Sequence, residues 1–121
     1  MTSLSKALLN NTDLSWDVTK DPCSWKGITC SPGNLSITKI SLSGFSISSS
    51  DFLPILCQID SLVSLDLSNN RLTSIPDSFI TDCGEIGGLQ LLNISRNMLG
   101  GPLPTFHGFV GLQFLDLSFN S

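Results

Sequence analysis

An eleven-residue pattern recurs along the chain and constrains its fold more than any other feature. Residues 62–72 read LVSLDLSNNRL, with apolar residues at the first, fourth and sixth places, asparagine at the ninth and leucine at the eleventh. The pattern returns at residues 89–99 and, as far as its ninth place, at 112–120; a degenerate copy at 37–47 has Phe45 instead of the asparagine. Starts at residues 37, 62, 89 and 112 give steps of 25, 27 and 23 residues. Such a period predicts a solenoid in which each repeat forms one coil.

The residue types explain why the coils must stack. Each repeat supplies one short strand whose apolar side chains point inward, and a single coil cannot bury them alone. The asparagines at the ninth place are expected to form a ladder, because an amide side chain can satisfy backbone groups inside the coil; they are Asn70, Asn97 and Asn120. Replacing Asn70 or Asn97 by leucine should cost roughly 1–3 kcal/mol for each buried group left unsatisfied.

The segment before the repeats is predicted to cover the open end of the first coil. Apolar residues at helical spacing predict a short helix over residues 4–10. Cys23 and Cys30, seven residues apart, predict a small hairpin closed by a disulfide. Trp16 and Trp25 are expected to lie over the first coil, since a terminal repeat otherwise presents its core to water.

The other two cysteines are predicted to form a second disulfide. Repeat two has surplus residues 81–85, which are expected to bulge on the convex or lateral side. Cys57 and Cys83 lie near equivalent places of adjacent coils, which are about 5 Å apart in the strand layer, a separation compatible with a disulfide. The alternative is two buried free thiols. Zinc has little support, because the cysteines lack paired ligand spacing and His107 is the single histidine.

Two kinds of motif carry a resemblance to a known family. The repeats are similar to the strand segment of leucine-rich repeats. Residues 21–30, DPCSWKGITC, resemble the N-terminal cap of plant leucine-rich-repeat receptor-like kinases and receptor-like proteins. Residues 99–104, LGGPLP, resemble the plant-specific L-x-G-x-I/L-P segment, and residues 72–76 a shortened form of it.

The resemblance implies an α/β solenoid, a right-handed superhelix with short parallel strands on its concave face. Residues 1–36 are expected to form the cap and residues 37–121 about four repeats without a closing cap. This is the N-terminal part of a receptor ectodomain, whose membrane span and kinase would lie further along.

Composition limits which classes of partner the chain could bind and indicates the cellular compartment in which it folds. The net charge of −4 excludes nucleic acid, because phosphate binding needs a basic patch. The sequence contains no run of about 18 apolar residues, the length that a membrane-spanning helix needs. The first ten residues lack the apolar segment of a secretory signal, whereas four cysteines and three glycosylation sequons, at Asn10, Asn34 and Asn93, indicate the secretory pathway. We interpret the chain as a mature segment from which the signal peptide is absent.

Outward positions of successive strands are predicted to line a concave binding face. The candidates are Lys39, Ser64, Asp66, Leu91, Asn93, Arg96, Phe114, Asp116 and Phe119, and a row of serines at 43, 68, 95 and 118 is expected beside them. The Asp and Ser rows are typical of the repeat itself. Apolar Leu91, Phe114 and Phe119 beside Arg96 favour a peptide- or protein-binding surface; the alternative is burial under further repeats or a neighbouring loop. A glycan on Asn93 would restrict access to this face.

These features predict a recognition module rather than an enzyme. No nucleophile set or phosphate-binding loop occurs, so neither catalysis nor a cofactor is expected. The resemblance implies a peptide or protein ligand, and a co-receptor ectodomain, at the extracellular face of the plasma membrane (the apoplast). The alternatives are a freestanding secreted protein, such as an inhibitor of a cell-wall-degrading enzyme, and a truncated gene product without a working site.

Overall fold

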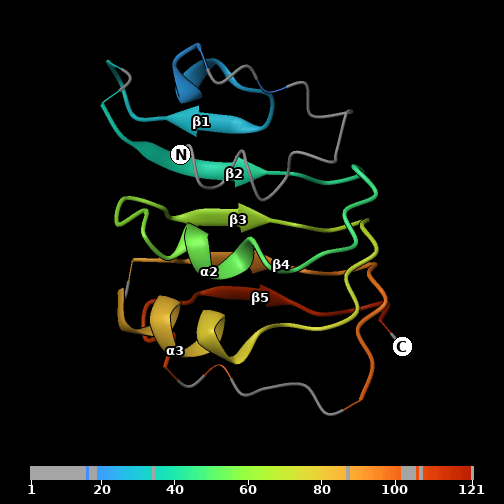
Figure 1. The fold of residues 1–121 in the computed structure, drawn as a ribbon. Helices are drawn as coiled ribbons and strands as arrows, with labels where there is room; N and C mark the ends of the chain where they lie inside the picture. Colours follow the sequence, from blue (N-terminus) through green and yellow to red (C-terminus); the bar gives the residue numbers. More distant parts are fainter. Residues whose placement is uncertain are drawn as a thin grey trace.

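A single sheet runs through the molecule from the cap to the last coil (Figure 1). The computed structural model describes residues 16, 19–33, 35–86, 88–101, 106 and 108–120, with the side chains of 82–86 excepted. The five strands follow in chain order: β1 (Ile28–Cys30), β2 (Ile37–Ser41), β3 (Ser64–Asp66), β4 (Leu91–Asn93) and β5 (Phe114–Asp116). Strands β2 to β5 are parallel, as a stack of coils requires. The predicted helix over residues 4–10 and His107 lie outside the described residues.

The cap joins the solenoid through an antiparallel strand. A disulfide links Cys23 to Cys30 across 5.7 Å between their Cα atoms, as predicted. The predicted hairpin between these cysteines is wrong: the segment forms a short 3-10 helix, η1 (Pro22–Ser24), and then β1, which pairs antiparallel with β2. The cause is local, because the Asp21 carboxylate accepts a hydrogen bond from the Cys23 N–H and holds the first half in a turn.

Both tryptophans cover the first coil, as the sequence predicts. Trp25 is buried in the core and Trp16 packs against that core. Their rings stack with centroids 4.8 Å apart. The indole N–H of Trp16 donates a hydrogen bond to the carbonyl of Lys26, so its polar edge is satisfied within the cap.

Two helices lie on one side of the sheet, α2 (Leu53–Leu56) and α3 (Asp77–Ile86) (Figure 1). The surplus residues 81–85 lie on the convex side, as expected, but they continue α3 and form no separate bulge. A helix satisfies their backbone groups internally. The fully buried Phe79 anchors the first turn of α3 to the core.

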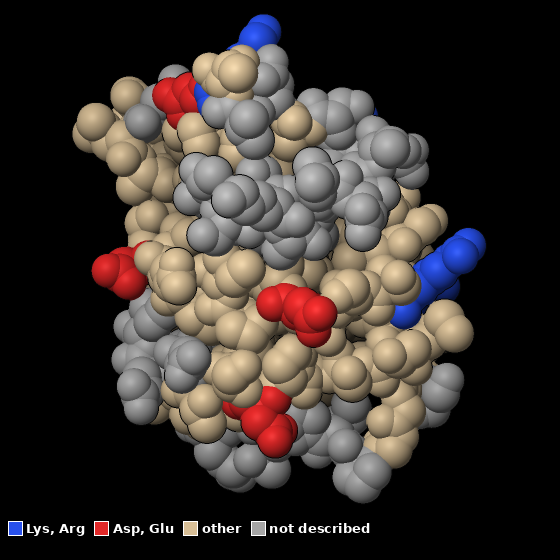
Figure 2. Space-filling model, in the orientation of Figure 1, with Lys and Arg blue, Asp and Glu red and all other residues tan. Residues whose placement is uncertain are grey.

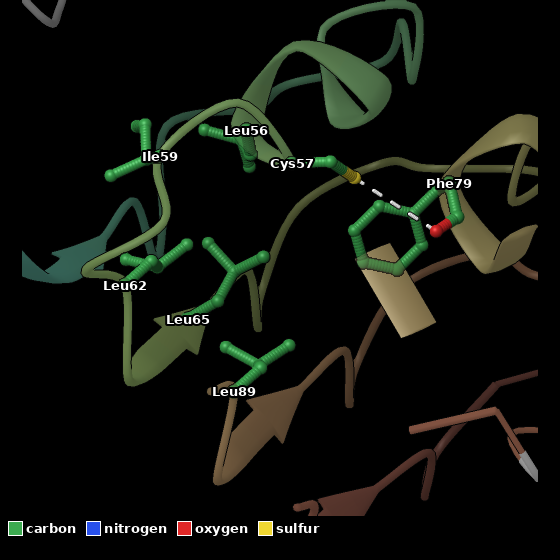
Figure 3. Close-up of a pocket in the computed structure, with 7 residues that line it drawn as sticks. All are labelled: Leu56, Cys57, Ile59, Leu62, Leu65, Phe79 and Leu89. Carbon is green, nitrogen blue, oxygen red and sulfur yellow. Dashed lines mark hydrogen bonds between the residues drawn. The ribbon is translucent and has the colours of Figure 1, made fainter. Parts of the chain in front are cut away.

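A small apolar hollow lies between α2, α3 and the strand layer (Figure 3). It is lined by Leu56, Cys57, Ile59, Leu62, Leu65, Phe79 and Leu89, with room for about one water molecule. Cys57 is disulfide-bonded, so its sulfur has no proton to donate, and it contacts the Phe79 carbonyl oxygen at 3.9 Å. The side chain of Cys83 lies outside the described residues, and its pairing with Cys57 stays a prediction.

The ninth-place asparagines connect successive coils. The Asn70 amide donates to the carbonyls of Leu42 and Leu67, and its oxygen accepts from the N–H groups of Phe45 and Ile47. Asn97 and Asn120 make the same kind of bonds one and two coils later. Each asparagine therefore satisfies backbone groups of its own coil and of the preceding one.

The inward column of the strands is buried in β2 to β4 and partly exposed on β5. Ile40, Leu65 and Leu92 are fully buried, whereas Leu115 on β5 is 39% exposed. Each inner strand has a neighbouring coil on both sides, and β5 has one. Within the described residues, no helix has the length and hydropathy needed to cross a membrane.

Candidate functional site

The outward residues of β2 to β5 form two straight rows. Strand pairing aligns Lys39, Ser64, Leu91 and Phe114 in one row, and Ser41, Asp66, Asn93 and Asp116 in the other. Because side chains alternate across a strand, these rows share the sheet face opposite the buried Ile40, Leu65 and Leu92. The structure thus brings the predicted strand positions onto one face.

The first row becomes apolar toward the last coil. Lys39 is exposed and Ser64 half-buried, and they are followed by the half-buried Leu91 and by Phe114, which is 48% exposed. Within the described residues, no segment buries this aromatic ring. An aromatic side chain held on a strand loses little conformational freedom when a partner packs against it.

A third row follows the strands, at the eighth place of each repeat. Its residues are exposed and have left-handed backbone angles: Gly44 (φ 80°), Asn69 (56°), Arg96 (55°) and Phe119 (57°). Glycine and asparagine tolerate this conformation, whereas arginine and phenylalanine enter it at a cost of about 1–2 kcal/mol each. The guanidinium carbon of Arg96 lies 4.3 Å from the centroid of the Phe119 ring, in a cation–π contact.

The carboxylates and the amide of the second row organise the turns that follow the strands. The Asp66 side chain accepts from the Ser68 N–H at 2.9 Å, and the Asp116 side chain accepts from the Ser118 N–H and hydroxyl. Asn93 makes the same pair of bonds with Ser95. This row is therefore used in folding as well as facing the surface.

The expected surface row of serines is wrong in the middle coils. Ser68 and Ser95 are each only 6% exposed, and the Ser68 hydroxyl lies 3.0 Å from the Ser43 hydroxyl. These serines come directly before the left-handed residues, where the chain leaves the strand and turns inward. Ser118, on the last coil, is exposed.

On this face, the pKa of the Asp116 carboxyl group is lowered. Hydrogen bonds from the Ser118 hydroxyl and N–H lower the pKa of Asp116 below its ordinary value of 3.8, and the Arg96 charge adds to the effect. The carboxylate is therefore ionised beside the arginine at neutral pH. Asp116 and Arg96 together present both signs of charge next to the exposed Phe119.

Other predicted sites lie away from this face or beyond the described residues. The sequons at Asn10 and Asn34 fall outside the described residues, whereas Asn93 lies on β4. Within the described residues, no cluster of His, Cys, Asp or Glu could hold a metal ion. In the view of Figure 2, Asp and Glu are scattered, and Lys and Arg lie near the margins. The described part of that view offers no concentrated charge to a partner.

The sequence prediction missed two features of the site. The left-handed row and the stacking of Arg96 on Phe119 were not anticipated, although both residues had been placed on the binding face. A signal was present, because Arg96 and Phe119 each directly precede a ladder asparagine, one repeat apart. Gly44 and Asn69, residue types that favour left-handed angles, occupy the same place in the earlier repeats.

Comparisons with known proteins agree with this geometry. Residues 60–121 match the family model described as leucine rich repeat, and residues 1–31 match the leucine rich repeat N-terminal domain. The chain belongs to the leucine-rich-repeat family. Its parallel strands and its disulfide-closed N-terminal segment are those of a capped leucine-rich-repeat solenoid, as predicted.

Curated relatives of this leucine-rich-repeat chain come from plants. Protein BRASSINOSTEROID INSENSITIVE 1 of Arabidopsis thaliana is 34% identical over 134 residues, covering 88% of this chain and 11% of the relative. Further relatives are described as receptor-like protein kinases or receptor-like proteins. The chain spans only 8% to 13% of the length of these relatives.

Solved structures share the leucine-rich-repeat fold. The BIR2 ectodomain of Arabidopsis thaliana superposes with a TM-score of 0.74 at 26% identity, over 91% of this chain and 59% of that one. A plant ice-binding protein gives a TM-score of 0.76 at 27% identity, over 98% and 38% of the two chains. This chain resembles a leucine-rich-repeat ectodomain, a non-catalytic protein-interaction module, and no enzymatic domain is evident in it.

Proposed function

We propose that this chain is part of the extracellular recognition module of a plant receptor-like kinase or receptor-like protein. Its concave face binds a peptide or protein ligand, or a co-receptor ectodomain, and binding is coupled to signalling across the plasma membrane. The module works in the apoplast. Residues 1–36 serve as its cap and residues 37–121 as its repeats.

One observation carries this proposal: Phe114, Phe119 and Arg96 are exposed on the last coils although the core does not require them there. Exposed aromatic and arginine side chains on rigid backbone are the residue types that contribute most to protein–protein binding. Leu91 extends the apolar surface from Phe114 into the middle of the face. A partner with an apolar side chain flanked by charge fits this combination.

The experiment compares a face variant with a matched control. The secreted chain, before and after enzymatic removal of its glycans, is passed over immobilised ectodomains of plant leucine-rich-repeat co-receptors, with and without secreted plant peptides. Phe114→Ser is expected to weaken binding at least tenfold, the loss of about 1.4 kcal/mol that removing a central aromatic contact causes. Val110→Ser is the control, because Val110 is 83% exposed and lies outside the strands.

Three outcomes contradict the proposal. They are the absence of binding across the panel, equal binding by the wild type and Phe114→Ser, and equal losses in both variants. Inhibition of a cell-wall-degrading enzyme through the same face, without co-receptor binding, would instead identify a freestanding secreted protein.

A further inference from the structure

Asn93 departs from the residues that share its row. The row runs Ser41, Asp66, Asn93 and Asp116, so an amide stands between two carboxylates. The turn that follows keeps the same hydrogen bond. The Asn93 side chain accepts from the Ser95 N–H, as the Asp66 side chain accepts from the Ser68 N–H. The turn thus uses an amide as it uses a carboxylate. The amide has two other consequences: it keeps a third negative charge out of the row between Asp66 and Asp116, and it creates the sequence Asn–Ile–Ser, an acceptor for N-linked glycosylation.

We infer that Asn93 carries an N-linked glycan, and that this glycan covers the apolar part of the concave face and regulates access to it. The coverage rests on geometry, whereas its effect on ligand binding rests on the proposed function. Occupied chains would present a shielded face, and unoccupied chains an open one.

The hydrogen bonds of Asn93 use its side-chain oxygen, Oδ1, and do not use its side-chain nitrogen, Nδ2. Its Oδ1 accepts from the Ser95 N–H at 3.0 Å and from the Ser95 hydroxyl at 2.7 Å. Within the described residues, the Nδ2 group has no hydrogen-bond partner, and no buried side-chain nitrogen there is left unsatisfied. The Nδ2 group therefore keeps some contact with solvent, on a side chain that is itself half-buried. Nδ2 is the atom that receives the sugar, so the folded coil can keep its turn and carry a glycan together.

Transfer of the sugar to Asn93 requires one co-reactant, an oligosaccharide linked through pyrophosphate to a polyprenyl lipid. A bond forms between Nδ2 and the anomeric carbon of the first sugar, while the bond from that carbon to the pyrophosphate oxygen breaks. The lipid pyrophosphate leaves with the bonding electrons, and the amide gives up one proton to the medium. Neither oxidant nor reductant is consumed.

The position of Asn93 explains why its glycan would act on the binding face. Leu91 lies two residues earlier on the same face of β4, about 7 Å along the strand. Phe114 is the partner of Leu91 on β5, and Asp116 is the partner of Asn93. An N-linked glycan is bulky and solvated, so one attached at Asn93 stands directly beside the apolar residues that a ligand would contact.

Site occupancy is tested on the full chain secreted from plant cells. The protein is deglycosylated in ¹⁸O-water by a glycosidase that converts glycosylated asparagine into aspartate, and the peptides are analysed by mass spectrometry. We expect ¹⁸O-labelled aspartate at position 93. Unlabelled asparagine at position 93 in the folded, secreted protein would overturn the inference.

Two variants remove the acceptor with residue types that already occupy this row, and they differ in charge. Asn93→Asp copies Asp66 and Asp116, and Asn93→Ser copies Ser41, so both residue types already occupy this row. Both variants should be secreted and migrate faster than the wild type by one glycan. If only the aspartate variant changed ligand binding, the added charge, and not the loss of sugar, would be responsible, which contradicts regulation by the glycan.

Coverage is measured by hydroxyl-radical footprinting, which needs no ligand. Oxidation of Phe114 should rise several-fold in Asn93→Ser and in enzymatically deglycosylated protein, while that of Val110 stays constant. An unchanged Phe114 rate in glycosylated protein contradicts coverage. The proposed function fails separately: a glycan that shields Phe114 on a chain that binds no co-receptor or peptide, in either form, supports the inference and rejects the receptor role.

Discussion

The guanidinium group of Arg96 is stacked on the ring of Phe119 from the next coil, 4.3 Å from the ring centroid. The two residues hold the same place in successive repeats, and both are exposed. Their left-handed backbone angles point the side chains out of the coil just beyond the strands. The contact therefore fixes the direction of a cation and an aromatic face on the surface before any partner arrives, which reduces the entropy lost on binding.

A double-mutant cycle measures this contact. Arg96→Gln and Phe119→Leu should show a coupling free energy of about 0.5–1 kcal/mol in urea unfolding, the range for an exposed cation–π pair. The cycle of Arg71→Gln with Phe119→Leu is the control, because Arg71 is exposed but lies two coils away. A coupling in the Arg96 cycle no larger than in the control would show that the stacking contributes nothing to stability.

The asparagine ladder should fail most severely in the middle of the stack. Asn97→Leu leaves the Leu72 N–H without its acceptor and removes the donor to the carbonyls of Leu67 and Ile94. At roughly 1–3 kcal/mol for each unsatisfied buried group, the lost free energy is a large part of the roughly 5–15 kcal/mol by which a native domain is stable. Asn120→Leu should cost less, because Asn120 is half-buried and water can replace its bonds. Equal shifts in the urea midpoints of the two variants would contradict the ladder's dependence on burial.

The rows of the concave face could be predicted from sequence for a simple reason. Side chains alternate along a strand, and the repeat period fixes which residues meet between coils. Leu91 and Phe114 therefore had to be neighbours once the repeats were recognised, and the strand register places them so. The Cys23–Cys30 disulfide was predictable because the two cysteines are seven residues apart and bracket Trp25 and Gly27, which suits a small closed segment.

The errors arose where tertiary packing outweighs local sequence. Residues 81–85 contain Gly84, a weak helix former, yet they extend α3 because Phe79 and the coils beneath anchor the helix. Ser68 was expected on the surface because the alternation of β3 was extended to it, but the strand ends at Asp66, two residues earlier. The left-handed residue that follows turns the chain, and only the three-dimensional path of that turn shows that Ser68 is buried.

Acid should weaken the last coil through Asp116. The pKa of Asp116 is lowered first by the Ser118 hydroxyl, then by the Ser118 N–H, with a smaller contribution from Arg96. The ionised form is thus favoured in the folded state, so the stabilisation is present above the unfolded-state pKa and is lost as pH falls through the lower, folded-state value. Carboxyl NMR titration should show Ser118→Ala raising the pKa of Asp116 more than Arg96→Gln does.

The dependence on salt separates the two causes. Added salt screens the Arg96 charge but does not break a hydrogen bond to Ser118, so the pKa of Asp116 should change little with salt in the wild type. A large rise with salt, or a larger effect of Arg96→Gln than of Ser118→Ala, would show that the charge dominates.

Among the glycines whose surroundings the structure describes, Gly27 should be the hardest to replace. Its φ is +84°, and a Cβ at this position would lie 2.2 Å from the backbone oxygen of Ser41, where the cap meets the first coil. The Gly27 carbonyl also accepts a hydrogen bond from the Ser41 N–H at 2.7 Å, so the two backbones cannot separate without losing it. Gly27→Ala should therefore destabilise the chain by about 2–3 kcal/mol or more in thermal unfolding, since steric overlap adds to left-handed strain. Gly101→Ala isolates the strain alone at about 1–2 kcal/mol, because φ is +70° there and, among the described residues, nothing lies within 4 Å of the new Cβ. Gly100→Ala, also in open space but without a positive φ, should be neutral or stabilising by up to about 1 kcal/mol. If Gly27→Ala cost no more than Gly101→Ala, the close approach of cap and first coil would not be required for stability.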